Sequence, residues 1–153
     1  LLFLMSTLLH SVPQKYKRFW AILDHSSIYI LIAGTYTPFL LLAIGGATGI
    51  VMLCVIWSIA IFGVAFKCLF IHRFEKFSLS LYIVMGWLII FFIRPLYSHL
   101  TLEGFMLLLA GGVLFTFGSI FFMWTKLPYN HAIWHLFVIA GCGCMVGCVA
   151  FYL

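Results

Sequence analysis

The sequence predicts an all-α fold, a polytopic bundle of transmembrane helices, and two observations carry this prediction. Hydrophobic residues make up 66% of the chain and charged residues only 7%, whereas about a quarter of the residues of a soluble domain are charged. The apolar residues also form continuous runs of about 20, the length at which a helix crosses the hydrocarbon core of a bilayer. Because the runs are continuous rather than alternating, a β-barrel is disfavoured.

The runs predict five complete helices and the end of one more. The incomplete helix covers residues 1–12 and has about half the length of a spanning helix. The five complete spans are expected at 19–43, 48–66, 77–93, 102–124 and 131–153. No polar linker separates them, so we expect one integral-membrane domain over residues 1–153. The apolar start carries no charged leader, which indicates a fragment that begins inside a helix.

Glycine, proline and a capping residue mark the expected helix ends and irregularities. Gly34 and Pro38 are placed to kink the 19–43 helix. A turn is expected at Gly45–Gly46, and Arg94–Pro95 is expected to end the 77–93 helix. Asn130 is a candidate N-cap for the last helix.

Small residues inside the spans are expected to pack helices together. Gly143 and Gly147 form a G-x-x-x-G motif on the last helix. The cysteines lie in or beside apolar segments, which favours packing over a disulfide framework; they are Cys54, Cys68, Cys142, Cys144 and Cys148. Metal binding by one of the last three is the alternative.

The basic residues predict the orientation. Seven of the eight are expected near one side of the membrane, namely Lys15, Lys17, Arg18, Lys67, Arg73, Lys76 and Lys126, and only Arg94 near the other. The positive-inside rule places the first group in the cytoplasm and the C-terminus outside, in a multi-pass protein of the cell membrane. The net charge of +5 is scattered over short loops, so it predicts no nucleic-acid partner.

Four ionisable side chains are expected in the cytoplasmic leaflet: His10, Asp24, His131 and His135. Ionisable groups are costly in a membrane and indicate a functional site. His131 and His135 are four residues apart, so they share a helix face and can bind one ion. Three histidines with an open position are typical of catalytic zinc, although the residue types also fit iron or copper. The alternative is that the histidines only hydrogen-bond to one another and to backbone groups.

Two further features belong to the candidate site. Ser6 precedes His10 by four residues and shares its face. Asp24 heads a stripe that continues through Ser27, Leu31, Thr35 and Pro38, which we expect to face the bundle. A haem held by two histidines is disfavoured, because this spacing directs both rings to one point.

Longer motifs carry a family resemblance. Residues 23–39 read LDHSSIYILIAGTYTPF, and further matches are Ser6-x-x-x-His10, Met85-Gly86-Trp87 and residues 130–137, NHAIWHLF. This pattern resembles the bacterial hemolysin III proteins of the progestin and adipoQ receptor family. The resemblance implies a fold of seven transmembrane helices, with the first helix and the start of the second upstream of this sequence. It also implies zinc bound by His10, His131 and His135, with Ser6 and Asp24 close to the metal or its water.

The expected function is that of a zinc-dependent hydrolase of amide bonds in membrane lipids. Zinc can lower the pKa of a bound water to about 7, and Asp24 and Ser6 are the candidate catalytic residues beside it. Membrane lipids are the expected partners, and a homo-oligomer is compatible with the sequence. The alternatives are a non-catalytic, receptor-like protein with structural zinc and a pore-forming cytolysin, as the family name suggests. The pore is disfavoured because no span carries a polar stripe across the membrane.

Overall fold

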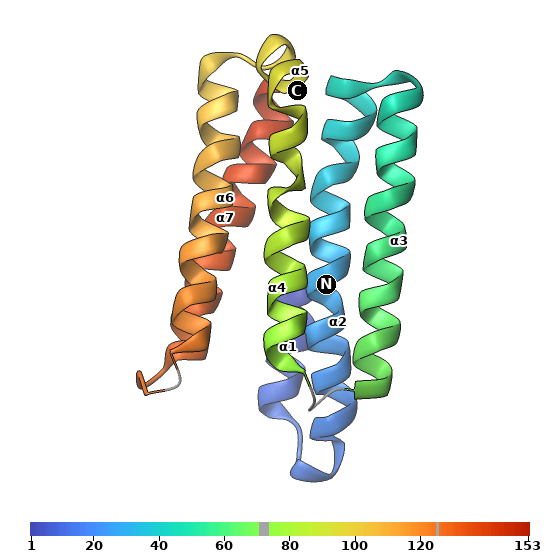
Figure 1. The fold of residues 1–153 in the computed structure, drawn as a ribbon. Coiled ribbons are helices and arrows are strands. Elements are labelled where there is room, and N and C mark those ends of the chain that lie inside the picture. The colour runs from blue at the N-terminus through green and yellow to red at the C-terminus, as the bar shows by residue number, and fades with distance from the viewer. Residues whose placement is uncertain (71–73, 125) are drawn as a thin grey trace. The chain divides into compact units, whose positions relative to one another are not determined.

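The computed structural model of the chain describes residues 1–70, 74–124 and 126–153, and every regular element within them is helical. Arg73, which the sequence places near the cytoplasmic side, lies outside the described residues. In chain order the elements are α1 (Leu2–Ser11), η1 (Gln14–Tyr16), α2 (Lys17–Pro38), η2 (Phe39–Ile44), α3 (Gly46–Phe70), α4 (Glu75–Trp87), η3 (Leu88–Phe92), α5 (Ile93–His99), α6 (Leu102–Met123) and α7 (Asn130–Tyr152) (Figure 1).

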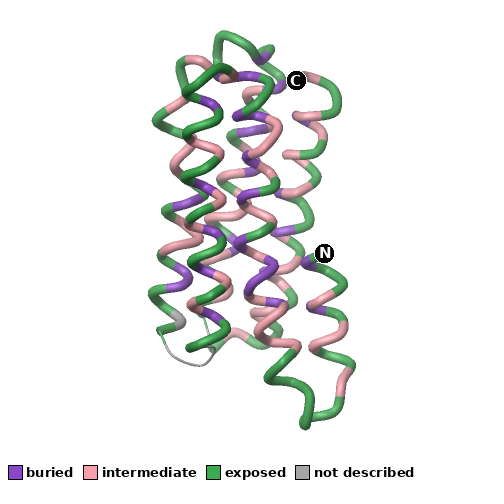
Figure 2. Tube along the Cα trace, turned by 90° about the vertical axis from the view of Figure 1, so that its right-hand side faces the viewer, coloured by how far each residue is buried: buried purple, intermediate pink, exposed green. Residues whose placement is uncertain are grey.

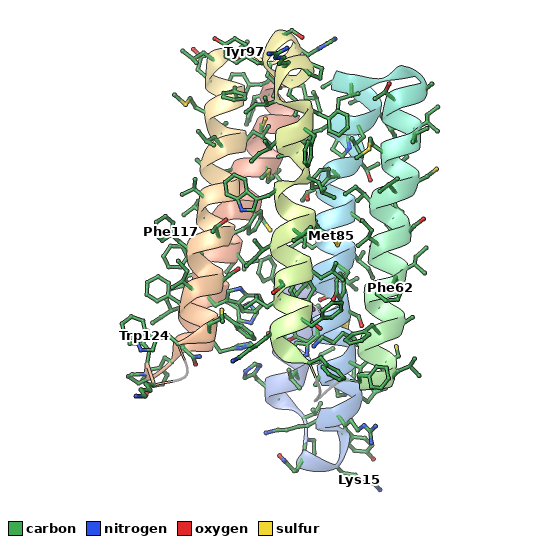
Figure 3. All side chains as sticks on the ribbon, in the orientation of Figure 1. Lys15, Phe62, Met85, Tyr97, Phe117 and Trp124 are labelled. Atoms are coloured by element: carbon green, nitrogen blue, oxygen red, sulfur yellow. The ribbon has the colours of Figure 1, made fainter. Side chains whose placement is uncertain are left out.

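Within the described residues, five helical stretches are long and apolar enough to cross a membrane, as the sequence predicts. They are Gln14–Ile44, Gly46–Phe70, Lys76–His99, Leu102–Met123 and Asn130–Tyr152, and the shorter α1 is also apolar. Much of each span is not covered by protein (Figure 2). Phe62 of α3 and Phe117 of α6, for example, are exposed and point away from their helices (Figure 3). Apolar side chains of this kind are suited to contact lipid, so the all-α transmembrane fold class is confirmed.

The helices form two compact units, and the first contains residues 1–41 and 45–86. In this unit α2 packs beside both α1 and α3 (Figure 1). The fully buried Tyr29 of α2 lies against Gly63 of α3, where an added Cβ would come within 2.4 Å of the tyrosine ring. The Tyr36 hydroxyl of α2 donates to the Met85 carbonyl of α4 at 2.7 Å. Glycine and tyrosine together therefore set how α3 and α4 meet α2.

The second unit contains residues 42–44 and 87–153 and is built on an antiparallel pair, α6 and α7. Gly104, Gly111 and Gly118 lie seven residues apart on α6 and are all buried. An added Cβ at these glycines would come within 2.6, 2.9 and 2.8 Å of side chains of α7. The Cys148 thiol of α7 contacts the Gly104 carbonyl at 3.1 Å, in keeping with a packing role for this cysteine. The single domain expected over residues 1–153 stays a prediction.

The glycines that pack this pair are not the expected ones. Among the described residues, an added Cβ at Gly143 would meet nothing within 4 Å, and at Gly147 only Leu107 at 3.8 Å. The close approaches are at the three α6 glycines and at Gly141 of α7, where an added Cβ would come within 2.7 Å of the Phe115 ring. Spacing alone therefore did not identify the glycines at which α6 and α7 approach each other, because a G-x-x-x-G pattern does not show which side meets a partner.

Two expected helix boundaries are also wrong. Lys67 is not in a loop: α3 continues to Phe70, and Lys67 is buried in its last turn. Arg94–Pro95 does not end the helix either, because it lies in the first turn of α5. Proline is tolerated there, since the first turn of a helix has no intrahelical acceptors for its N–H groups.

The Asn130 cap and the predicted kink also differ from expectation. Tyr129 holds the N-cap position of α7, and the Asn130 side chain donates instead to the Phe122 carbonyl near the end of α6, at 3.2 Å. Gly34 lies inside a continuous α2, and the change of helix type comes after Pro38, where the chain becomes π-helical. The expected turn at Gly45–Gly46 is present, and both residues have φ near +60°, a conformation that glycine adopts readily.

Candidate metal centre

The first part of the candidate site lies at the start of α7, in the second unit. His131 and His135 are four residues apart on consecutive turns, so their rings meet on one face of the helix. Their Nε2 atoms are 3.0 Å apart, and their ring centroids 4.7 Å apart. Trp134 is buried and packs against both imidazoles. The first turns of α7 therefore bring two imidazole nitrogens close together.

The separation of these nitrogens suits a shared metal ion. Zinc binds imidazole nitrogen at about 2.0–2.1 Å, which places two nitrogens of a tetrahedral site about 3.3 Å apart. The observed 3.0 Å is close to that value. A shift of a few tenths of an ångström in the side chains would allow both nitrogens to bind one ion.

The second part lies in the first unit, where α1 packs on α2. Asp24 of α2 is fully buried, and Ser6 of α1 is buried beside it. The Ser6 hydroxyl and the His10 imidazole are close enough to interact with the Asp24 carboxylate electrostatically. Neither carboxylate oxygen, however, has a hydrogen bond of good geometry within the described residues. This corner of the unit therefore holds a serine, a histidine and a carboxylate with unused acceptor capacity.

The hydrogen bond of His10 fixes its tautomer. Its Nδ1 lies 2.9 Å from the Ser6 carbonyl oxygen. A carbonyl can only accept, so Nδ1 carries a proton, and in a neutral imidazole the lone pair would then be at Nε2. Metal-binding histidines generally donate their second ring N–H to a carbonyl or carboxylate in this way. His10 is thus in the tautomer that a metal ligand bound through Nε2 requires.

The residues predicted for the site fall into these two groups. Ser6, His10 and Asp24 come together in the first unit, and His131 meets His135 in the second. Among the residues that the structure describes, no group of three His, Cys, Asp or Glu side chains is placed to hold a metal ion. The zinc site with three histidines stays a prediction.

The sequence did not point to three hydroxyl-bearing residues that lie where α2 meets α4, namely Tyr29 of α2 and Ser78 and Tyr82 of α4. Ser78 and Tyr82 lie four residues apart on α4, and the Tyr82 ring packs on Tyr29 with centroids 4.4 Å apart. Tyr82 also donates to the His25 carbonyl at 2.9 Å. Their spacing was a signal that could have found them, because residues four apart share a helix face.

The buried side of α2 is also only partly the predicted one. Asp24 and Ser27 are buried as expected, but Leu31, Thr35 and Pro38 are only half-buried. The buried residues beyond Ser27 are Tyr29, Ala33 and Tyr36. Two tyrosines and an alanine, rather than the rest of the predicted stripe, are the buried residues of this part of α2.

Comparisons with known proteins identify the family. The family model for haemolysin-III related proteins matches residues 1–146. Hemolysin-3 of Bacillus cereus is 58% identical over all of this chain and 70% of its own length, and the Hemolysin-3 homolog of Bacillus subtilis (strain 168) is 51% identical over 99% of the chain and 72% of its own length. The human monocyte to macrophage differentiation factor is 30% identical over 90% of the chain and 59% of its own length. No solved structure matches the chain. The resemblance seen in the motifs is therefore confirmed, and the chain belongs to the haemolysin-III related family of multi-pass membrane proteins.

Proposed function

We propose that the protein binds one zinc ion through His10, His131 and His135 near the cytoplasmic face and hydrolyses an amide bond in a membrane lipid. In this role it would serve membrane lipid homeostasis. The observation that carries the proposal is the convergence of the His131 and His135 Nε2 atoms to 3.0 Å at the start of a membrane-spanning helix. The His10 tautomer adds support, because it directs the lone pair to the nitrogen farther from the backbone.

The donor set suits catalytic rather than purely structural zinc. Catalytic zinc sites have three protein ligands and keep an open position, whereas structural sites are closed by four. Three imidazoles leave one position for water or substrate. A zinc ion bound there would supply Lewis acidity and lower the pKa of a bound water to about 7.

Asp24 is the proposed general base. Its carboxylate oxygens accept no hydrogen bond of good geometry within the described residues, so the group can accept a proton from the attacking water. Asp24 then returns that proton to the leaving amine nitrogen as the carbon–nitrogen bond breaks, which yields a carboxylic acid and an amine. The Ser6 hydroxyl, buried beside Asp24, is proposed to hydrogen-bond the water and hold it in place.

The setting favours a lipid as the substrate. Asp24, His131 and His135 all lie within stretches that are long and apolar enough to span a membrane. A substrate that reaches them from the bilayer must itself partition into lipid. A structural zinc that ties helices together is the alternative that the experiment must distinguish from the hydrolase.

The first experiment compares the lipid profiles of cells that express the full-length wild type, Asp24→Asn or His135→Ala. The amide is nearly the size of the carboxylate, so Asp24→Asn should keep the zinc but abolish turnover of the lipid, because an amide cannot take a proton from water. Glu103→Gln is the matched control, since it makes the same change at an exposed position in the first turn of α6. It should leave the profile of the wild type.

The outcomes separate the functions. Loss of one lipid amine product in both Asp24→Asn and His135→Ala supports the hydrolase. Identical profiles in all variants, with only His135→Ala unstable in detergent, support structural zinc. A second candidate function is that of a pore-forming cytolysin, because two relatives carry the name Hemolysin-3. If the protein is a cytolysin, red-cell lysis by the wild type should persist in Asp24→Asn, and the lipid profiles should not differ.

A further inference from the structure

The Asp24 carboxylate interacts with Ser6 and His10 of α1, and its position also depends on the backbone of α2. Both of its oxygens lack a partner of good geometry among the described residues, although the residue is fully buried. A side chain with few such bonds is positioned in part by its backbone. The location of the carboxylate therefore depends on what fixes this turn of α2.

Two side-chain hydroxyls fix this turn through successive carbonyls. The Ser27 hydroxyl donates to the Asp24 carbonyl at 2.6 Å, from within the same helix. The Tyr82 hydroxyl donates to the His25 carbonyl at 2.9 Å, from the neighbouring helix α4. The second bond is the important one, because it ties the backbone beside Asp24 to another element and so sets the height and rotation of α2 there.

Tyr82 is itself held by its surroundings. Its ring packs on the Tyr29 ring, with centroids 4.4 Å apart. Tyr29 is in turn closely packed against Gly63 of α3, where a larger residue would collide with it. The backbone next to Asp24 is therefore hydrogen-bonded to Tyr82 of α4, and Tyr82 packs on Tyr29, which in turn packs on α3.

We propose that Tyr82 is a positioning residue for Asp24, which acts by holding the His25 carbonyl and with it the adjoining turn of α2. This inference rests on the proposed function in one respect, which is that Asp24 takes part in turnover. The positioning itself is a statement about geometry and can be tested without any activity.

The chain offers a matched control in Tyr36. Its hydroxyl also joins α2 to α4, by donating to the Met85 and Gly86 carbonyls at 2.7 and 2.8 Å (Met85 is labelled in Figure 3). Tyr36 lies twelve residues along the chain from Asp24, about 18 Å of helix. Tyr82→Phe and Tyr36→Phe each remove one hydroxyl from the same helix pair and keep the ring. Only the first removes it beside Asp24.

Asp24 is the only aspartate among residues 1–153, so its carboxyl carbon can be followed directly once its signal is assigned. The full-length protein with its metal is labelled with [4-¹³C]aspartate, and Asp24→Asn assigns the carboxyl signal in the ¹³C spectrum. Tyr82→Phe should shift or broaden that signal, while Tyr36→Phe should leave it at its wild-type position. An unchanged signal in Tyr82→Phe would overturn the proposal, and so would an equally large shift in Tyr36→Phe, which would indicate general loosening of α4.

The second measurement is the rate of lipid hydrolysis. A misplacement of about 1 Å can cost roughly 100-fold in rate, so Tyr82→Phe should lower kcat by about 10- to 100-fold with KM and zinc content unchanged, and Tyr36→Phe should not. If the carboxyl signal shifts but even the wild type hydrolyses no lipid, the proposed function fails and the positioning stands. If Asp24→Asn abolishes turnover while Tyr82→Phe changes neither signal nor kcat, the positioning fails and the function stands.

Discussion

At the scale of single residues, the histidine pair of α7 is the clearest chemical feature of the molecule. A spacing of four brings His131 and His135 together on any α-helix, and here their Nε2 atoms are 3.0 Å apart. In the absence of a metal one ring must donate to the other, whereas an ion would allow both to bind through their lone pairs. We therefore expect the pair to lose little side-chain entropy if it binds an ion.

The prediction at this scale concerns the metal. Purified full-length protein should contain about one zinc per chain, and His131→Ala or His135→Ala should lose most of it. The reason is that two of three imidazoles bind zinc much more weakly than three. Metal content by mass spectrometry is the measurement, and His99→Ala, a change at an exposed histidine, is the control. Full zinc occupancy after His10, His131 and His135 are all replaced by alanine would contradict the proposed ligands.

At the scale of elements, glycines decide which helix faces meet. In lipid the surroundings are as apolar as the helix faces, so association depends on close packing rather than on burial of apolar surface. On α6 the buried glycines recur every seven residues and accept bulky side chains of α7 such as Phe137 and Tyr152. In the first unit Gly63 does the same for Tyr29. Both close contacts pair a glycine on one helix with a large side chain on the next.

The prediction for this element compares two alanine substitutions on α6. An added Cβ at Gly118 would come within 2.8 Å of Phe137 Cβ, whereas at Gly112 it would meet nothing within 4 Å. Alanine raises helix propensity equally at both sites, by up to about 1 kcal/mol, so the difference between the two variants isolates the packing cost. Gly118→Ala should be less stable than Gly112→Ala by about 1–3 kcal/mol. Thermal unfolding in detergent measures this difference, and equal melting temperatures would show that Gly118 is not a close contact.

At the scale of the whole molecule, the basic residues predict the orientation in the membrane. Lys15 and Lys126 are exposed, in keeping with positions outside the hydrocarbon. Lys67 is buried in the last turn of α3 rather than in the loop that follows. It still lies at the end of α3 that is predicted to be cytoplasmic, so the excess of basic residues predicts the same orientation.

The prediction at this scale is an accessibility experiment. In a cysteine-depleted variant, a single cysteine at position 15 or 126 should react with a membrane-impermeant reagent only from the cytoplasmic side, and one at position 153 only from the outside. The native cysteines to be replaced are all free, so no disulfide is lost. Labelling of position 153 from the cytoplasmic side alone would reverse the orientation and move the proposed site to the outer leaflet.

What the sequence alone determined are the features that depend on local chain properties. The fold class and the five spans follow from the length and apolar character of each run, which a single segment expresses by itself. The pairing of His131 with His135 and of Ser6 with His10 follows from helical periodicity. The family also follows, because its motifs are contiguous and the comparisons bear them out.

What only the tertiary structure decided is which faces of the helices meet. The sequence predicts close packing at Gly143 and Gly147 and a bundle-facing role for Leu31 and Thr35. The close contacts are made instead by Gly63, by the α6 glycines and by tyrosines. The contact of Tyr82 with the backbone beside Asp24 joins residues 57 positions apart. In a membrane protein both the lipid-facing and the buried faces are apolar, so the hydrophobic pattern does not reveal the rotation of a helix. Packing between distant segments sets that rotation, and with it the surroundings of Asp24.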